Sequence, residues 1–185
     1  MQQKTGDELF SNQEMHLNYS LSDFWGWYAS NLLHGALRGA VAEYIVSRAL
    51  EIPTDECRQD WEAFDVLFGD KRIEVKSSAY YQCDEQDKPS RISFSISKHT
   101  RWNPDTKWTD SKRESDLYIF CVLGDSDDFG MDPMDVSQWN FYILKTEELD
   151  SKLGDQQTLS LSSLLAMKPL YSSYDDLKHN VESIL

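Results

Sequence analysis

Cysteines, long apolar runs and targeting signals are scarce or missing in this chain of 185 residues. Its three cysteines, Cys57, Cys83 and Cys121, are odd in number and form no CxxC pair, which argues against a disulfide framework or a zinc ribbon. No apolar run is long enough to span a bilayer, and the polar first residues lack a signal-peptide pattern. We therefore expect a protein of the reducing cytoplasm with no membrane partner.

Several catalytic signatures are also missing. The histidines, His16, His34, His99 and His179, are scattered and form no HExxH or similar zinc-ligand set. No GxSxG elbow surrounds Ser77–Ser78, so a serine nucleophile has no support. Neither a GxGxxG nor a Walker loop is present, which argues against nucleotide-cofactor chemistry.

Basic residues are few compared with acidic ones. The chain holds 18 Lys and Arg against 32 Asp and Glu, for a formal net charge of -14. Nucleic-acid-binding proteins are usually basic, because neutralised phosphates supply most of their affinity. An acidic chain can still bind DNA if its basic residues are concentrated in one place, or if a bound metal offsets its carboxylates.

What is present describes a folded globular protein. Hydrophobic residues make up 40% of the chain and aromatic residues 12%, and the length suits a single domain over 1–185. The first dozen residues are polar and are expected to be loose, and Ser22–Asp23 could cap a helix. Apolar spacing predicts a further helix over about 34–49 and helical structure again in the last forty residues. Strands are predicted over 62–68, 71–77, 91–97, 117–123 and 139–144.

This order of helices, strands and helices predicts an α/β sandwich around a central mixed sheet of five strands. The run from Leu117 to Leu123 is continuously apolar, which is typical of a strand buried on both faces. The run from Arg91 to Ser97 alternates with period two, so one of its faces should be buried.

The predicted hairpin over 64–76 contains two acidic residues and a lysine that could form a metal site. Gly69–Asp70 suits a two-residue turn, because glycine accepts a positive φ at the first central position. That turn would pair Asp65 directly with Glu74 and place Lys76 on the same face. The opposite face would be apolar, so a slip of one residue would mix the two sets of side chains.

Two directly paired carboxylates have Cβ atoms about 4.5–5.5 Å apart and repel each other unless a cation lies between them. A hard divalent cation such as Mg²⁺ or Mn²⁺ takes oxygen ligands, and the carbonyl of Val75 could supply another. The ammonium of Lys76 could then reach a water or a phosphate oxygen beside the metal. The alternative is a solvated charged face on which Arg72 and Lys76 simply neutralise Asp65 and Glu74.

A third acidic residue, Glu43, lies among apolar neighbours on the predicted helix. A carboxylate close to a core is costly unless it is paired or bound to a metal, although Glu43 could equally be an edge residue that faces water. Gly35 and Gly39, four residues apart, could let this helix approach the sheet closely.

Taken together, these residues resemble the PD-(D/E)xK nuclease superfamily, which has the restriction-endonuclease-like fold. The matching elements are Glu43 on a helix, then Asp65, then Glu74-Val75-Lys76 on the next strand, within residues 35–123. Gln82 matches a glutamine that uncharacterised bacterial members often carry after the lysine, whereas Phe64 stands where the motif has proline.

The resemblance implies a nuclease-like core over about 22–145 and a C-terminal helical part over about 146–185. It implies that Asp65, Glu74, Glu43 and the carbonyl of Val75 bind Mg²⁺ or Mn²⁺. Lys76 would position or activate the attacking water. The implied catalytic residues are Lys76, Glu74, Asp65, Glu43 and Gln82.

The segment 98–113 is the candidate contact with DNA. It holds five basic residues against Asp105 and Asp110, a local excess of three positive charges, with two tryptophans interleaved. Such residues can hold backbone phosphates and stack on bases, although the tryptophans could instead pack on the domain. A later acidic loop should lie away from DNA; its aspartates are Asp125, Asp127, Asp128, Asp132 and Asp135. The predicted nucleic-acid-binding residues are Arg101, Trp102, Lys107, Trp108, Lys112 and Arg113.

The sequence thus predicts a metal-dependent nuclease that hydrolyses phosphodiester bonds, with DNA as the favoured substrate. One alternative is a non-catalytic domain of the same fold that binds nucleic acid or protein, and a more distant one is a plain protein-interaction module. By resemblance the chain could also form a homodimer or join a larger complex of defence or mobile-element proteins.

Overall fold

A mixed five-stranded sheet forms the centre of the protein. The computed structural model describes residues 2–58, 63–82, 86–100, 102–103, 105, 107–108, 110–124 and 130–185. The central sheet has the order β11 (Leu170–Ser172), β9 (Trp139–Lys145), β8 (Leu117–Leu123), β4 (Lys71–Ala79) and β3 (Val66–Phe68). Strands β4 and β8 are parallel and the other neighbours are antiparallel. The predicted α/β class with a central five-stranded mixed sheet is confirmed.

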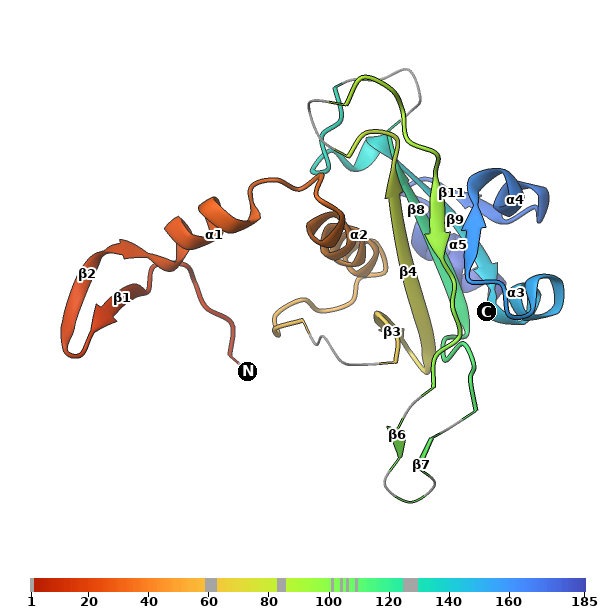
Figure 1. The fold of residues 1–185 in the computed structure, drawn as a ribbon, viewed down its shortest axis with the longest axis horizontal. Helices are drawn as coiled ribbons and strands as arrows, with labels where there is room; N and C mark the ends of the chain where they lie inside the picture. The colour runs from red at the N-terminus through yellow and green to blue at the C-terminus, as the bar shows by residue number, and fades with distance from the viewer. Residues whose placement is uncertain are drawn as a thin grey trace.

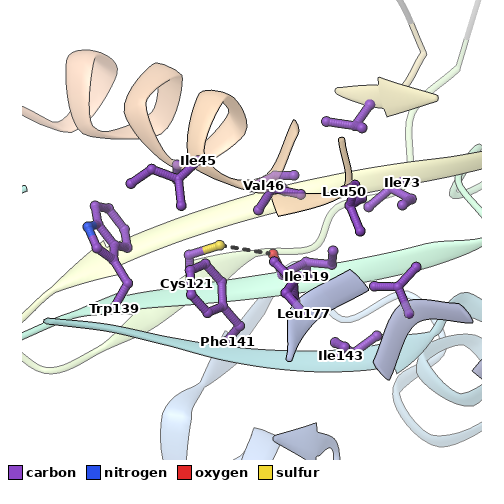
Figure 2. Close-up of a cluster of buried hydrophobic side chains, with 14 of the residues drawn as sticks. Ile45, Val46, Leu50, Ile73, Ile119, Cys121, Trp139, Phe141, Ile143 and Leu177 are labelled. Carbon is purple, nitrogen blue, oxygen red and sulfur yellow. Dashed lines mark hydrogen bonds between the residues drawn. The ribbon is translucent and has the colours of Figure 1, made fainter. Parts of the chain in front are cut away.

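Helices cover both faces of this sheet (Figure 1). Helices α2 (Gly35–Ala49) and α5 (Leu177–Ile184) pack on one face, and α3 (Thr146–Leu153) and α4 (Leu161–Ala166) lie on the other. Figure 2 shows Ile45 and Val46 of α2 above Ile73, Cys121 and Phe141 of the sheet, all of them buried.

The central strand β8 explains why the core has two halves. All seven of its residues are buried, because β4 and β9 flank it and helices cover both of its faces. Leu117, Ile119 and Cys121 belong to the cluster beneath α2, whereas Tyr118 and Phe120 belong to the cluster on the other face. The prediction of a strand buried on both faces is confirmed.

One predicted strand lies outside the central sheet. Only Ser93–Ser95 (β5) is a strand within 91–97, and it pairs with β10 (Thr158–Ser160) in a separate two-stranded sheet. Its alternating residues Ile92, Phe94 and Ile96 pack on the core cluster of the second face. The edge strand β11 takes the fifth place in the central sheet, so residues after 146 are not purely helical as predicted.

The N-terminal residues are more ordered than predicted. Strands β1 (Leu9–Asn12) and β2 (Met15–Ser20) form a hairpin that leads into helix α1 (Leu21–Ala29). The cap of α1 is Ser20, in a reciprocal capping box with Asp23, and not Ser22–Asp23. No residue of α1 is buried, and Figure 1 shows the hairpin and α1 standing apart from the sheet.

The remaining elements are short. Strands β6 (Trp102–Asn103) and β7 (Lys107–Trp108) form a two-stranded hairpin, and Val136–Gln138 forms a 3₁₀ turn (η1) before β9. Among the residues that the structure describes, no helix has the length and apolar character needed to cross a membrane.

Candidate functional site

The β3–β4 hairpin has the predicted register, but Asp65 lies outside it. Val66 pairs with Ile73, Leu67 with Arg72 and Phe68 with Lys71. The backbone N–H of Asp65 donates to the carbonyl of Ile73 at 3.0 Å, so the predicted direct pairing of Asp65 with Glu74 is wrong. The ladder shifts by one residue there, so Asp65 and Val66 both lie opposite Ile73, and β3 begins only at Val66.

The Asp65 side chain hydrogen-bonds to β4 beyond the last backbone pair of β3 and β4. Its Oδ2 accepts the N–H of Val75 at 2.7 Å. Because the N–H and C=O of one strand residue point to the same edge, the carbonyl of Val75 also faces this side. On the opposite edge of β4, Asp116 Oδ2 accepts the N–H of Arg72 at 2.8 Å. An aspartate therefore binds β4 along each edge.

Glu74 and Lys76 form an ion pair on the face of β4 that also carries Tyr118 of β8. Lys76 Nζ lies 2.5 Å from Glu74 Oε1, and Ser115 Oγ donates to Glu74 Oε2 at 3.1 Å. Only 16% of the Glu74 side chain and 28% of the Lys76 side chain are exposed, so this is not a solvated charged face. Arg72 pairs with Glu114 instead, at 3.6 Å.

Glu43 reaches the same sheet edge from helix α2. Its side chain is 15% exposed and is bound by both ends of one guanidinium, with Arg58 Nε 2.5 Å from Oε2 and Nη2 2.8 Å from Oε1. Glu43, Arg58 and Asp65 line a cleft of about 870 Å³ with Lys4 and Tyr44. The Glu43 carboxylate is thus paired with Arg58 and is not turned to open water.

The predicted glycine contacts of α2 are absent. A Cβ atom at Gly39 would meet nothing within 4 Å, and one at Gly35 would meet only Arg38 Nη2 at 4.0 Å. Close approach of α2 to the sheet therefore does not depend on these two glycines.

Electrostatics link the four predicted residues. Burial is the main cause that raises the pKa of Asp65 from its ordinary value of 3.8 to about 6, and the charge of Glu74 is the second. The N–H of Val75 and the ammonium of Lys76 oppose this rise, whereas the charge of Glu43 adds to it. The charges of Glu74, Lys76 and Glu43 therefore all influence the pKa of Asp65, which is expected of groups that belong to one site.

We expect Asp65→Asn to stabilise the protein at neutral pH in the absence of divalent cations. Because the pKa of Asp65 is raised in the folded state, folding favours its protonated form, and stability falls as the pH rises from about 4 through about 6. Asparagine keeps an oxygen for the Val75 N–H but carries no charge. Denaturant unfolding across pH 4 to 8 should show a gain of about 3 kcal/mol at most above pH 6, which vanishes near pH 4.

Asp70→Asn is the matched control, since Asp70 lies in the turn of the same hairpin with 88% of its side chain exposed. This variant should follow the wild-type pH profile. A wild-type protein whose stability rises between pH 4 and pH 6 relative to Asp65→Asn would contradict the raised pKa.

The oxygen donors suit a hard divalent cation, although they are partly occupied by cations of the chain. Among the described residues, no group of three or more His, Cys, Asp or Glu side chains lies close enough together to hold a metal ion. Arg58 binds Glu43, and Lys76 with Ser115 binds Glu74. Asp65 Oδ1 accepts no hydrogen bond from the part of the chain that the structure describes. Asp65 is thus the donor that is most available to a metal.

Gln82 does not join this group. It lies beyond the end of β4, with its backbone N–H bonded to Gln86 Oε1 at 3.1 Å and its side chain bonded to Ser90 Oγ at 3.4 Å. Both partners follow β4 in the chain. The structure therefore places Gln82 with this loop and away from Asp65.

The predicted nucleic-acid-binding residues lie on or beside the β6–β7 hairpin, which projects from the domain in Figure 1. Trp102 and Trp108 are direct partners across the two strands, and Lys107 is exposed. Lys112 is 59% exposed and lies 3.2 Å from Glu114, which also pairs with Arg72. Arg101 lies outside the described residues, as do Asp125, Asp127 and Asp128 of the predicted acidic loop.

Arg113 does not fit the predicted role in nucleic-acid binding. Its side chain is fully buried, with Nη1 2.5 Å from Asp150 Oδ1 and Nε donating to the carbonyl of Ile96 at 2.8 Å. It also donates to the carbonyls of Gly154 and Gln156 at 3.0 and 3.1 Å. These bonds use four of the five N–H donors of the guanidinium, and the side chain has no exposed surface for a phosphate to reach, so Arg113 is a structural residue.

Two contacts of this site could not be read from the sequence. Arg58 follows α2 in a loop, and Ser115 lies 41 residues beyond Glu74, with no motif that marks either of them. Comparison with known proteins adds no further residues, since no family model, no curated protein and no solved structure matches the chain.

Proposed function

We propose that this protein is a metal-dependent nuclease that cleaves phosphodiester bonds, with DNA as its substrate. The observation that carries the proposal is the shielded cluster of Asp65, Glu74 and Lys76 at the edge of β4, with Glu43 within electrostatic range. Shielding carboxylates from water within electrostatic range of one another costs stability, and groups with strongly shifted pKa values cluster at functional sites.

In this proposal Asp65, Glu74 and Glu43 hold Mg²⁺ or Mn²⁺, with the carbonyl of Val75 on the same edge. When bound, such an ion polarises the scissile phosphate and lowers the pKa of a bound water. Lys76 orients the attacking water or stabilises negative charge that develops on the phosphate. The pairing of Lys76 with Glu74 at 2.5 Å keeps the ammonium directed at the cluster.

DNA would lie along the end of the sheet from which the β6–β7 hairpin projects. Strand β8 begins beside the start of β4, since Ile73 pairs with Leu117, so the segment before β8 lies at this end. Lys107 and Lys112 are exposed on this segment and can neutralise backbone phosphates. The acidic charge of the rest of the chain would keep nonspecific binding weak.

One observation favours a second candidate, a non-catalytic domain that binds nucleic acid or protein. Both oxygens of Glu43 are bound by Arg58, so the chain itself neutralises the acid that would complete the metal site. In a domain without catalysis, such ion pairs would give the acidic residues a structural role in place of a catalytic one.

Calorimetric titration with Mn²⁺ separates the two candidates. A nuclease should bind Mn²⁺ at a site that Asp65→Asn weakens at least ~10-fold, because a carboxylate ligand is lost. Asp155→Asn is the control, since the Asp155 side chain is 93% exposed and pairs only with Lys98 among the described residues. Plasmid nicking that requires Mg²⁺ or Mn²⁺ and is lost in Asp65→Asn would support catalysis.

Equal Mn²⁺ binding by the wild-type protein and Asp65→Asn would contradict the metal site. Mn²⁺ binding without any cleavage of single-stranded, duplex or nicked DNA would instead favour the non-catalytic domain.

A further inference from the structure

The N-terminal end of helix α2 carries the partial positive charge of the helix dipole and has no capping side chain. The helix spans 15 residues, its cap residue His34 makes no side-chain capping bond, and its first turn holds no acidic residue. The first helical bond runs from Arg38 N–H to the carbonyl of His34, at 2.9 Å. The N–H groups of Gly35, Ala36 and Leu37 precede that bond and therefore have no partner within the helix.

A buried guanidinium lies beside these amides. Arg38 is 6% exposed, and its Nη1 donates to the carbonyl of Leu33 at 2.8 Å. Its Nε has no hydrogen-bond partner, and no carboxylate among the described residues lies within ion-pair distance of it. A buried charge without an ion-pair partner destabilises the fold, so an anion that pairs with Arg38 would offset part of that destabilisation.

The arrangement leaves room for such an anion at the first turn. Helical side chains lean toward the N-terminus, and Arg38 does so, because its Nη2 lies 4.0 Å from the place where a Cβ of Gly35 would stand. Apart from its chain neighbours and the backbone of the same helix, no other described atom lies within 4 Å of that place, and both His34 and Gly35 are exposed. A ligand could therefore approach the amides of the first turn from solvent, with Arg38 Nη2 beside the place it would occupy.

We propose that the N-terminal end of α2 binds a phosphate group, with the amides of Gly35, Ala36 and Leu37 as donors and Arg38 as the buried cation. Helix N-termini bind phosphate because their free N–H groups and the helix dipole both favour negative charge. Glu43 lies eight residues further along α2, ~12 Å away, so this site is separate from the acidic cluster. The phosphate could be free or part of a nucleic-acid backbone.

Titration of inorganic phosphate into the full chain in EDTA tests the site without involving any metal. We expect binding by the wild-type protein with a rise in melting temperature, and at least ~10-fold weaker binding by Arg38→Gln. Gly35→Asp places a carboxylate in the open space beside Arg38. It should abolish phosphate binding and raise the melting temperature in the absence of phosphate, because it supplies the missing anion.

Arg48→Gln, in the last turn of the same helix, is the control and should bind phosphate like the wild-type protein. Anisotropy with a short fluorescent DNA duplex, also in EDTA, identifies the source of the phosphate. Weaker duplex binding by Gly35→Asp assigns the site to the nucleic-acid backbone, and unchanged duplex binding assigns it to a free phosphate or phosphomonoester. No phosphate binding by the wild-type protein, or equal binding by wild type and Gly35→Asp, would overturn the proposal.

Discussion

Lys76→Ala is expected to lower the rate of Mg²⁺-dependent DNA cleavage by ~100-fold or more, the usual range for loss of a positioned catalytic side chain. The reason is local. Lys76 is bound to Glu74 at 2.5 Å and its charge acts on Asp65, so it is the cation directed into the acidic cluster. Initial rates of plasmid nicking in Mg²⁺ measure the effect.

Metal binding by Lys76→Ala separates a catalytic lysine from a structural one. Removing the ammonium frees Glu74 Oε1, so calorimetry should show Mn²⁺ affinity equal to or above that of the wild-type protein. Lys71→Ala is the control at the start of the same strand, since among the described residues the Lys71 ammonium forms an ion pair only with the exposed Asp70, at 3.5 Å. Cleavage that persists in Lys76→Ala would refute the role assigned to this residue.

Arg113→Leu is expected to destabilise the fold by ~3–5 kcal/mol, as the breaking of a buried charged network generally does. The substitution removes the donors for Asp150 and for the carbonyls of Ile96, Gly154 and Gln156. These acceptors join the segment before β8 to the end of α3 and the loop after it, so the loss affects several elements together. Urea unfolding followed by circular dichroism measures the change.

The neighbouring basic residue provides the comparison. Lys112 is exposed and shares Glu114, which is 12% exposed, with Arg72, so Lys112→Ala should change stability by no more than ~1 kcal/mol. It should weaken DNA binding instead and reduce its dependence on salt. If Arg113→Leu kept its stability and lost DNA binding, Arg113 would return to the nucleic-acid interface.

Patterns of short range account for the parts of the fold that could be predicted. The glycine at position 69 has a φ of +62°, as the turn requires, and the register of β3 with β4 follows from it. The uniform hydrophobicity of Leu117–Leu123 predicts its burial, because a strand covered on both faces needs an apolar side chain at every position. Helix α2 is likewise close to its predicted bounds.

Predictions were wrong where distant segments decide the outcome. The period of 91–97 shows that one face is buried, but it cannot show that β10, more than 60 residues later, becomes its partner in place of the central sheet. Arg113 lies in a basic stretch and reads as a surface residue, yet its acceptors lie in residues 96 and 150–156. Such partners leave no trace in local spacing.

The candidate site shows the same division. The sequence placed Asp65, Glu74 and Lys76 on one hairpin, and the structure brings their charges together. Strand β3, however, begins only at Val66, so Asp65 lies opposite Ile73 and not opposite Glu74, and no sequence pattern marks that start. Arg58 was missed because a loop residue that contacts a helix 15 positions earlier has no periodic signal.

The hydrogen bond from the Val75 N–H to Asp65 means that this side chain has two separate roles, one in the backbone ladder and one in the proposed metal site. The backbone needs only an oxygen atom at this position, whereas metal chemistry needs a negative charge. Descendants of this protein that had lost activity could therefore exchange Asp65 for asparagine without rebuilding the strand edge, while an apolar replacement would leave an amide unsatisfied. In proteins related to this one, aspartate at this position would indicate that activity is retained, and asparagine would indicate that only the fold is retained.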